Sequence, residues 1–214
     1  MTDNQESGRD AARLPSFGGA DVELIERRCL HQGFFRLDEV HLRHRLFEGG
    51  WSGKMVREVH VRHDAVGVLL YDVERDSVAL VEQIRAGALD DPESPWKLEI
   101  VAGLVEGGES AAEVARREAM EEAGCEVNDL IELHTYYPSP GACSERVTLF
   151  CALVDCDGLG GVHGLDEEHE DIRVHVLPFH HAWELLQAGR LDNAMCLIAL
   201  QWLAAERASL RARG

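Results

Sequence analysis

The chain has 214 residues, of which 45% are hydrophobic and 28% are charged, and its formal net charge is −18 at pH 7. These values are typical of a globular protein with one sizeable domain, and no apolar run approaches the roughly 20 residues that a membrane-spanning helix requires. The negative charge argues against nucleic acid and anionic membranes as partners, because both bind basic surfaces. A small phosphorylated ligand is compatible with it, since divalent cations can lie between carboxylates and phosphates.

The N-terminus has no secretory signal pattern, and the six cysteines show neither a CxxC pair nor the Cys/His spacing of a zinc site. We therefore expect a cytoplasmic protein with unpaired thiols, because disulfides are rare in reducing compartments. Residues 1–20 are polar and glycine-containing, and they are predicted to form a flexible tail.

Residues 21–62 contain short segments in which apolar and polar residues partly alternate, as they do in half-buried strands. The stretch at residues 47–53 holds three glycines and is predicted to be a turn between the last two segments. The segments predict a small N-terminal antiparallel sheet, with strands at Val22–Leu30, Phe34–Leu46 and Met55–Val61.

The main domain is predicted to span residues 63–207, followed by a C-terminal tail at residues 208–214. Short apolar runs bounded by polar or turn residues predict its strands. These runs are Ala65–Tyr71, Val78–Ile84, Leu98–Ala102, Ile131–Tyr137, Val147–Val154 and Ile172–Leu177. Because the predicted order is strands, a helix, further strands and two helices, we expect an α+β fold with a mixed sheet between helices.

One helix is predicted from Ser110 to Ala123. Ser110 and Glu113 have the spacing of a capping box, and Gly124 is placed to end the helix. The two closing helices are expected at Phe179–Ala188 and Asn193–Arg207, with Asn193 as the N-cap of the second.

Three glutamates of the first predicted helix share one face, because Glu121 and Glu122 follow Glu118 by three and four residues. Like charges on adjacent turns repel one another, and a divalent cation would make the arrangement favourable. Arg117 is placed to pair with Glu121 four residues later and so to aim the other glutamates. A solvated glutamate-rich surface is the ordinary explanation for three such residues alone.

The spacing around these glutamates is more specific. The segment from Gly103 to Cys125 reads GLVEGGESAAEVARREAMEEAGC and resembles the Nudix box. Its seven specified residues, each occurring about once in fifteen, would match by chance about once in 10⁸ placements. It departs from the family pattern only at Ala119 and Cys125, where a larger aliphatic residue is usual. The resemblance implies a Nudix fold, with a mixed β-sheet sandwiched between helices and the small N-terminal antiparallel sheet beside it.

The resemblance extends to the ADP-ribose pyrophosphatase branch of that family, in its bacterial type. Pro140 follows the box at the distance that marks this branch, and the segment GLDEEHEDIRV at residues 164–174 is similar to the branch's catalytic loop. Residues 82–85 and 192–203 also resemble the bacterial enzymes. The similarity runs from about Glu23 to Ala205.

The resemblance implies the roles of the acidic residues. Glu118, Glu122 and the backbone carbonyl of Ala102 correspond to metal ligands, with Glu121 and Glu170 completing the metal set. Glu168 corresponds to the general base that activates water. The alternative for the last two is an exposed acidic loop, since five of the six residues 166–171 are acids.

Substrate contacts also follow from the resemblance. Phe34 and Phe35 correspond to a position that flanks the adenine, and the family uses the N-terminal sheet to form a homodimer. Arginines suit bidentate binding of phosphate, although a surface ion pair is the ordinary role of a lone arginine in a strand. The remaining expected substrate contacts are Arg57, Glu58, Arg62, Arg85, Leu104, Ser139 and Glu145.

The implied reaction is hydrolysis of ADP-ribose to AMP and ribose 5-phosphate. It is expected to use two or three Mg²⁺ ions per site, for which Mn²⁺ can substitute. Two alternatives stay open: a Nudix hydrolase of another nucleoside diphosphate derivative, such as a nucleotide sugar or dinucleotide polyphosphate, and a non-catalytic ADP-ribose sensor. A sensor would be expected to lose carboxylates of the box, which this chain retains.

Overall fold

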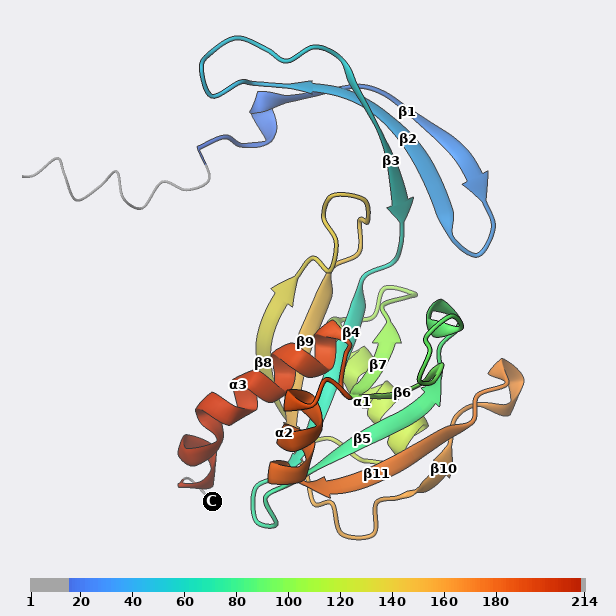
Figure 1. The fold of residues 1–214 in the computed structure, drawn as a ribbon, viewed down its shortest axis with the longest axis vertical. Helices are drawn as coiled ribbons and strands as arrows, with labels where there is room; N and C mark the ends of the chain where they lie inside the picture. Colours follow the sequence, from blue (N-terminus) through green and yellow to red (C-terminus); the bar gives the residue numbers. More distant parts are fainter. Residues whose placement is uncertain (1–15, 213–214) are drawn as a thin grey trace, which may run out of the picture. The chain divides into compact units, whose positions relative to one another are not determined.

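The structure, a computed structural model, describes residues 16–212. The first fifteen residues of the predicted N-terminal tail and the last two residues of the chain lie outside the described residues. The chain divides into two compact units (Figure 1). The first unit comprises residues up to Arg62 together with Ser139–Ser144, and the second comprises His63–Pro138 together with the chain from Glu145 onward.

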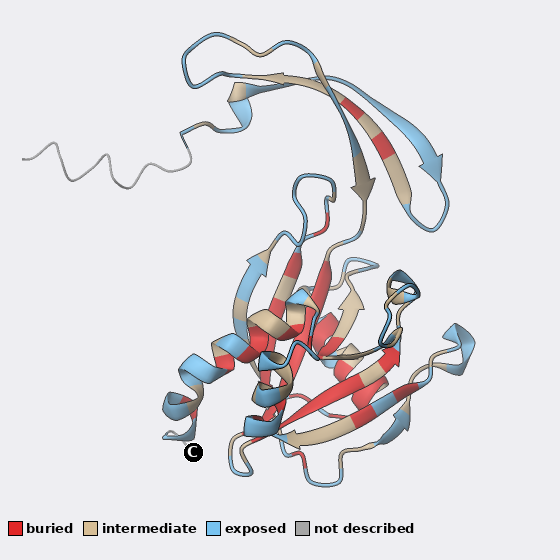
Figure 2. Ribbon diagram, viewed as in Figure 1, coloured by how far each residue is buried: buried red, intermediate tan, exposed pale blue. Residues whose placement is uncertain are grey.

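The first unit is a three-stranded antiparallel sheet in the order β1-β2-β3, formed by β1 (Val22–Gln32), β2 (Arg36–His44) and β3 (Met55–Val61). Among its described residues only Asp38 and Val40 are buried, and β1 is exposed along its whole length (Figure 2). This sheet therefore has almost no hydrophobic core of its own.

The second unit is built on a mixed sheet in the order β10-β11-β5-β4-β9-β8, in which β4 runs parallel to β9 and the other neighbours are antiparallel. Two short strands extend it, since β6 pairs with β5 and β7 pairs with β4. Its strands are β4 (Ala65–Asp72), β5 (Ser77–Ile84), β6 (Trp96–Glu99), β7 (Val101–Leu104), β8 (Asp129–Tyr136), β9 (Val147–Leu153), β10 (Gly161–His163) and β11 (Ile172–Pro178).

Helices cover both faces of this sheet (Figure 1). Side chains of α2 (Phe179–Gln187) and α3 (Ala194–Arg211) pack with Leu69 and Tyr71 of β4 on one face. Side chains of α1 (Ala111–Ala123) pack with Val68 of β4 on the other face. Because successive residues of a strand point to opposite faces, β4 is buried on both and reads as a continuous apolar run. The predicted α+β fold, with a mixed sheet between helices, is confirmed.

Two local predictions were wrong, and one strand was missed. The run 98–102 is not one strand but the end of β6 and the start of β7, which pair with different neighbours. The short strand β10 was not predicted. The last helix continues to Arg211, so residues 208–211 are not a tail: Leu210 is buried, and Arg211 pairs with Asp76 at 2.8 Å.

The six cysteines are all unpaired, as predicted, and four of them are buried. None of the helices within residues 16–212 is long and apolar enough to cross a bilayer.

Candidate functional site

The first helix is held at both ends by local interactions, which fixes the direction in which its glutamates point. The Ser110 hydroxyl accepts a hydrogen bond from the Glu113 amide, and the Glu113 carboxylate accepts one from the Ser110 amide at 2.8 Å. Gly124 ends the helix with a left-handed φ of 60°, and its amide donates to the Met120 carbonyl at 3.0 Å. Both predicted caps are confirmed.

Glu122 lies between the helix and the sheet and is only 4% exposed. One carboxylate oxygen accepts a hydrogen bond from the Ala102 amide of β7 at 3.0 Å, and the other accepts one from the Gln83 side chain of β5 at 3.2 Å. Burial raises the pKa of Glu122 to about 7, because desolvation disfavours the charged form and these neutral donors only partly offset it. No cation compensates this carboxylate at hydrogen-bond distance among residues 16–212.

Glu118 lies directly over the backbone of Gly103. A Cβ atom at position 103 would lie 1.9 Å from the Glu118 carboxylate oxygen, so only glycine leaves room for this side chain. Burial raises the pKa of Glu118 to about 7; the neighbouring Arg117 opposes the shift, and the carboxylates of Glu121 and Glu170 add to it. The glycine at position 103 thus allows Glu118 to lie against β7.

Arg117 organises the polar side of the same helix. Its guanidinium donates to Glu118 at 2.9 Å and to Glu121 at 2.8 Å, and it pairs with Glu109 at 3.3 Å. The predicted pairing of Arg117 with Glu121 is therefore present. Glu121 is engaged by a cation, whereas Glu122 is held only by neutral groups.

The acidic loop between β10 and β11 approaches the same helix. The Gly164 amide donates to the Glu121 carbonyl at 3.3 Å, and the Glu170 carboxylate accepts a hydrogen bond from the Leu165 amide at 3.2 Å. Gly164 has φ of 106°, and a Cβ there would lie 2.6 Å from the Cβ of Glu170. Glu170 is close enough to Glu118 to raise its pKa, while Glu168 is exposed at the loop surface.

The carboxylates of Glu118 and Glu122 fit a divalent cation. Within residues 16–212 no three side chains of His, Cys, Asp or Glu already converge as a closed ligand set. The donor chemistry nevertheless suits Mg²⁺, which takes one or two carboxylates and keeps its remaining positions for water and phosphate. Glu122 is buried and Glu118 is half-buried, and both have raised pKa values, so a cation would stabilise the charged form of these two groups most.

The residues predicted to contact substrate fall in both units. In the second unit, the Arg85 guanidinium donates to Glu99 at 2.6 Å, Leu104 is half-buried at the end of β7, and Glu145 is buried just before β9. Arg85, one of the three arginines expected to contact the substrate, thus has a carboxylate partner.

In the first unit, Phe35 packs edge-on against His60, and the Arg62 guanidinium lies 5.0 Å from the centre of the Phe35 ring. Phe34 packs against Phe35 and is 83% exposed. The other predicted contacts in this unit, Arg57, Glu58 and Ser139, are exposed.

Gln83 is the residue of this site to which the sequence assigned no role. It alternates along β5 with Ala79 and Val81, which face α1, so it carries a polar amide on a buried face. A polar residue at a position where the strand pattern predicts a buried apolar one is visible in the sequence, and it could have marked Gln83 as a candidate site residue.

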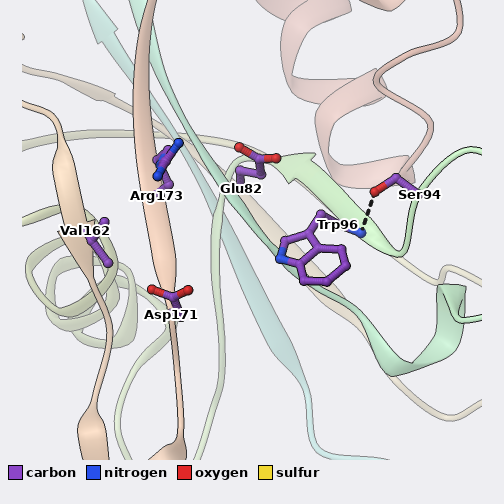
Figure 3. Close-up of a pocket in the computed structure, with 6 residues that line it drawn as sticks. All are labelled: Glu82, Ser94, Trp96, Val162, Asp171 and Arg173. Carbon is purple, nitrogen blue, oxygen red and sulfur yellow. Dashed lines mark hydrogen bonds between the residues drawn. The ribbon is translucent and has the colours of Figure 1, made fainter.

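A separate hollow of about 370 Å³ lies beside β5, β6 and β11 (Figure 3). Asp171 faces it from the end of the acidic loop, and the Trp96 amide donates to the Ser94 hydroxyl at 3.0 Å on the opposite side. Its lining residues are Glu82, Ser94, Trp96, Val162, Asp171 and Arg173. None of the predicted site residues lines it, so the candidate site is defined by the carboxylates of α1 and not by this hollow.

Comparisons with known proteins show which proteins this chain is similar to. A model of the NUDIX domain matches residues 61–197. The ADP-ribose pyrophosphatase of Escherichia coli K12 is 46% identical over 196 residues, covering 92% of this chain and 94% of that protein. The ADP-ribose pyrophosphatase of Haemophilus influenzae Rd is 42% identical over 206 residues, covering 95% of each chain.

More distant relatives differ in substrate. The GDP-mannose pyrophosphatase of Pectobacterium atrosepticum is 33% identical over 181 residues, covering 84% of this chain and 92% of that protein. A solved structure described as an ADP compounds hydrolase aligns with a TM-score of 0.65 and 22% identity, covering 87% of this chain and 96% of the other, which supports the fold.

Proposed function

The chain belongs to the NUDIX domain family, and from this membership we propose that it hydrolyses the diphosphate of ADP-ribose to AMP and ribose 5-phosphate. The observation that carries the proposal is the pair of carboxylates, Glu118 and Glu122, held against the backbone of β7. The relatives that are 42–46% identical over nearly the whole chain are ADP-ribose pyrophosphatases, which supports this substrate over others.

The metal set we propose is Glu118, Glu122, Glu121, Glu170 and the carbonyl of Ala102, holding two or three Mg²⁺ ions with Mn²⁺ as a substitute. Bound Mg²⁺ neutralises developing charge on phosphate and lowers the pKa of a water molecule. The chain supplies the ligands in two parts, because Glu118 and Glu122 are fixed by the fold and Glu170 belongs to the loop.

Glu168 is proposed as the general base that takes the proton from the attacking water. General-base catalysis contributes about 10²–10⁴-fold to rate. The exposed position of Glu168 suits this role, since the side chain is free of the packing that holds Glu122 and can approach the substrate when the loop moves.

Substrate recognition is proposed to involve aromatic, arginine and other side chains. Phe34 and Phe35 would flank the adenine, because exposed aromatic rings provide flat faces for stacking. Arginine side chains would meet the diphosphate and the terminal ribose, which polar groups and one apolar side chain also contact. These further contacts are Arg57, Glu58, Arg62, Arg85, Leu104, Ser139 and Glu145.

The first unit is proposed to form a homodimer. Its sheet buries only two side chains and exposes many large apolar ones, and such surfaces mark protein interfaces. The exposed apolar side chains are Val22, Leu24, Ile25, Leu30, Phe34, Phe35, Leu46, Phe47 and Val56. We further propose a cytoplasmic enzyme, in line with its unpaired cysteines. We propose that it binds neither nucleic acid nor membrane, since its net charge is −18.

A substrate panel tests the proposed function. The full chain is assayed with Mg²⁺ against ADP-ribose, ADP-glucose, NADH, diadenosine polyphosphates and GDP-mannose, and kcat/KM is compared. ADP-ribose is expected to give the highest value and to yield AMP. A higher kcat/KM for GDP-mannose would make a nucleotide-sugar hydrolase the better assignment, in line with the 33% identical relative.

A further inference from the structure

Gln83 reaches Glu122 from the central part of the sheet. It belongs to β5, is 7% exposed, and its side-chain amide donates to one Glu122 oxygen at 3.2 Å. Its neighbours on the same face of β5, Ala79 and Val81, are buried against α1. A polar amide in this apolar surrounding is costly unless it is hydrogen-bonded, so the contact with Glu122 fixes both side chains.

Both carboxylate oxygens of Glu122 thereby accept hydrogen bonds, each from a different strand. Gln83 of β5 donates to one oxygen, and the Ala102 amide of β7 donates to the other at 3.0 Å. Each carboxylate oxygen can accept two hydrogen bonds or ligand contacts, so each retains one free position. The carboxylate is oriented in this way, and it is still able to bind a cation.

The two donors are electrically neutral, and this distinguishes Glu122 from its neighbour Glu118. The Arg117 guanidinium donates to Glu118 at 2.9 Å and brings a positive charge. An amide provides the same direction of hydrogen bonding without compensating the charge of the acceptor. The two hydrogen bonds therefore orient Glu122 without placing a positively charged donor on it.

We propose that Gln83 is a positioning residue that orients Glu122 for a divalent cation without neutralising it. The proposal rests on the proposed function only in assigning Glu122 as a metal ligand. Fixing the side chain before binding removes the entropy that ordering it would cost, and metal affinity rises accordingly. A positive charge at position 83 would keep the hydrogen bond but compete with the metal for Glu122.

Two substitutions separate orientation from charge. Gln83→Met keeps the length and approximate volume of the side chain and removes the donor. Gln83→Lys keeps a donor and adds a charge. Gln201→Met is the matched control, because Gln201 is an exposed residue of α3.

The measurement is Mn²⁺ binding to the full-length protein without nucleotide, by the electron paramagnetic resonance signal of free Mn²⁺. Gln83→Met is expected to weaken binding about tenfold, which corresponds to about 1.4 kcal/mol. Gln83→Lys is expected to weaken binding more than tenfold, while the melting temperature of the metal-free protein stays at or above that of wild type. A purely structural role for Gln83 would not produce this combination.

Mn²⁺ affinity within twofold of wild type in the folded Gln83→Lys variant would overturn the proposal, even if Gln83→Met failed to fold. A loss of equal size in Gln201→Met would also overturn it, since the effect would then not be specific to the site. The substrate panel separates this outcome from failure of the proposed function. A wild-type enzyme that preferred another diphosphate would change the substrate and leave the Mn²⁺ comparison intact.

Discussion

Gly103→Ala tests whether the position of Glu118 matters for activity. The added Cβ would lie 1.9, 2.1 and 2.3 Å from the Oε1, Cδ and Cγ atoms of Glu118, whereas non-bonded carbon atoms pack at about 3.5–4.0 Å. The carboxylate must therefore move by about 1.5–2 Å. Displacements of about 1 Å at a catalytic centre can cost about 10²-fold in rate, so we expect turnover to fall by at least that factor.

The fold should tolerate this substitution, because the nearest atoms that collide belong to a flexible side chain and not to the backbone. The assay compares AMP release from ADP-ribose with the melting temperature of each variant. Gly53→Ala is the matched control, since a Cβ there meets nothing within 4 Å and the backbone φ is not left-handed. Turnover within threefold of wild type in Gly103→Ala would refute the reasoning, and so would equal losses of activity in both variants.

Further measurements address the loop, the dimer and the C-terminal helix. Glu168→Gln should lower turnover by about 10²–10⁴-fold with unchanged Mg²⁺ dependence. Glu170→Gln should instead raise the Mg²⁺ concentration needed for half-maximal rate. If high Mg²⁺ restored the turnover of Glu168→Gln and not that of Glu170→Gln, the two roles would have to be exchanged. Leu24→Asp, at a side chain 56% exposed, should convert a sedimenting dimer into a monomer, and a wild-type monomer with full activity would contradict the proposed interface. A hydrogen bond from the Arg207 guanidinium is the main cause that holds the pKa of Asp76 below its usual value. The contribution of this pair to stability is therefore fully present above the pKa of Asp76 in the unfolded chain. It is lost as pH falls through the lower pKa of Asp76 in the folded chain. Asp76→Asn should therefore lower the melting temperature at pH 7 and reduce its change below about pH 4, and an unchanged pH profile would count against the pair.

The sequence predicts α1 well because its determinants are local. The capping box and the terminal glycine are contiguous with the glutamates, and spacing along a helix converts directly into a shared face. The predicted strands Met55–Val61 and Ala65–Tyr71 also match closely, with the second ending one residue later in the structure. These features need no knowledge of how distant segments pair.

Features that depend on pairing between distant segments were predicted less well. The run 98–102 divides because its first part pairs with β5 and its second part with β4, which no local pattern reveals. The last helix extends to Arg211 because Leu210 is buried and Arg211 forms an ion pair with Asp76, which is distant in the sequence. Both misses come from tertiary contacts that override local propensity.

The structure also separates carboxylates that the sequence could only group together. Glu122 is 4% exposed and held by two strands, whereas Glu168 is exposed on a loop. A metal ligand benefits from being fixed, because ordering it on binding would cost entropy. A general base must exchange its proton with solvent after each turnover, and this requires access to water. The difference in burial thus follows the difference in proposed role, and it explains why charge and spacing alone could not assign the two functions.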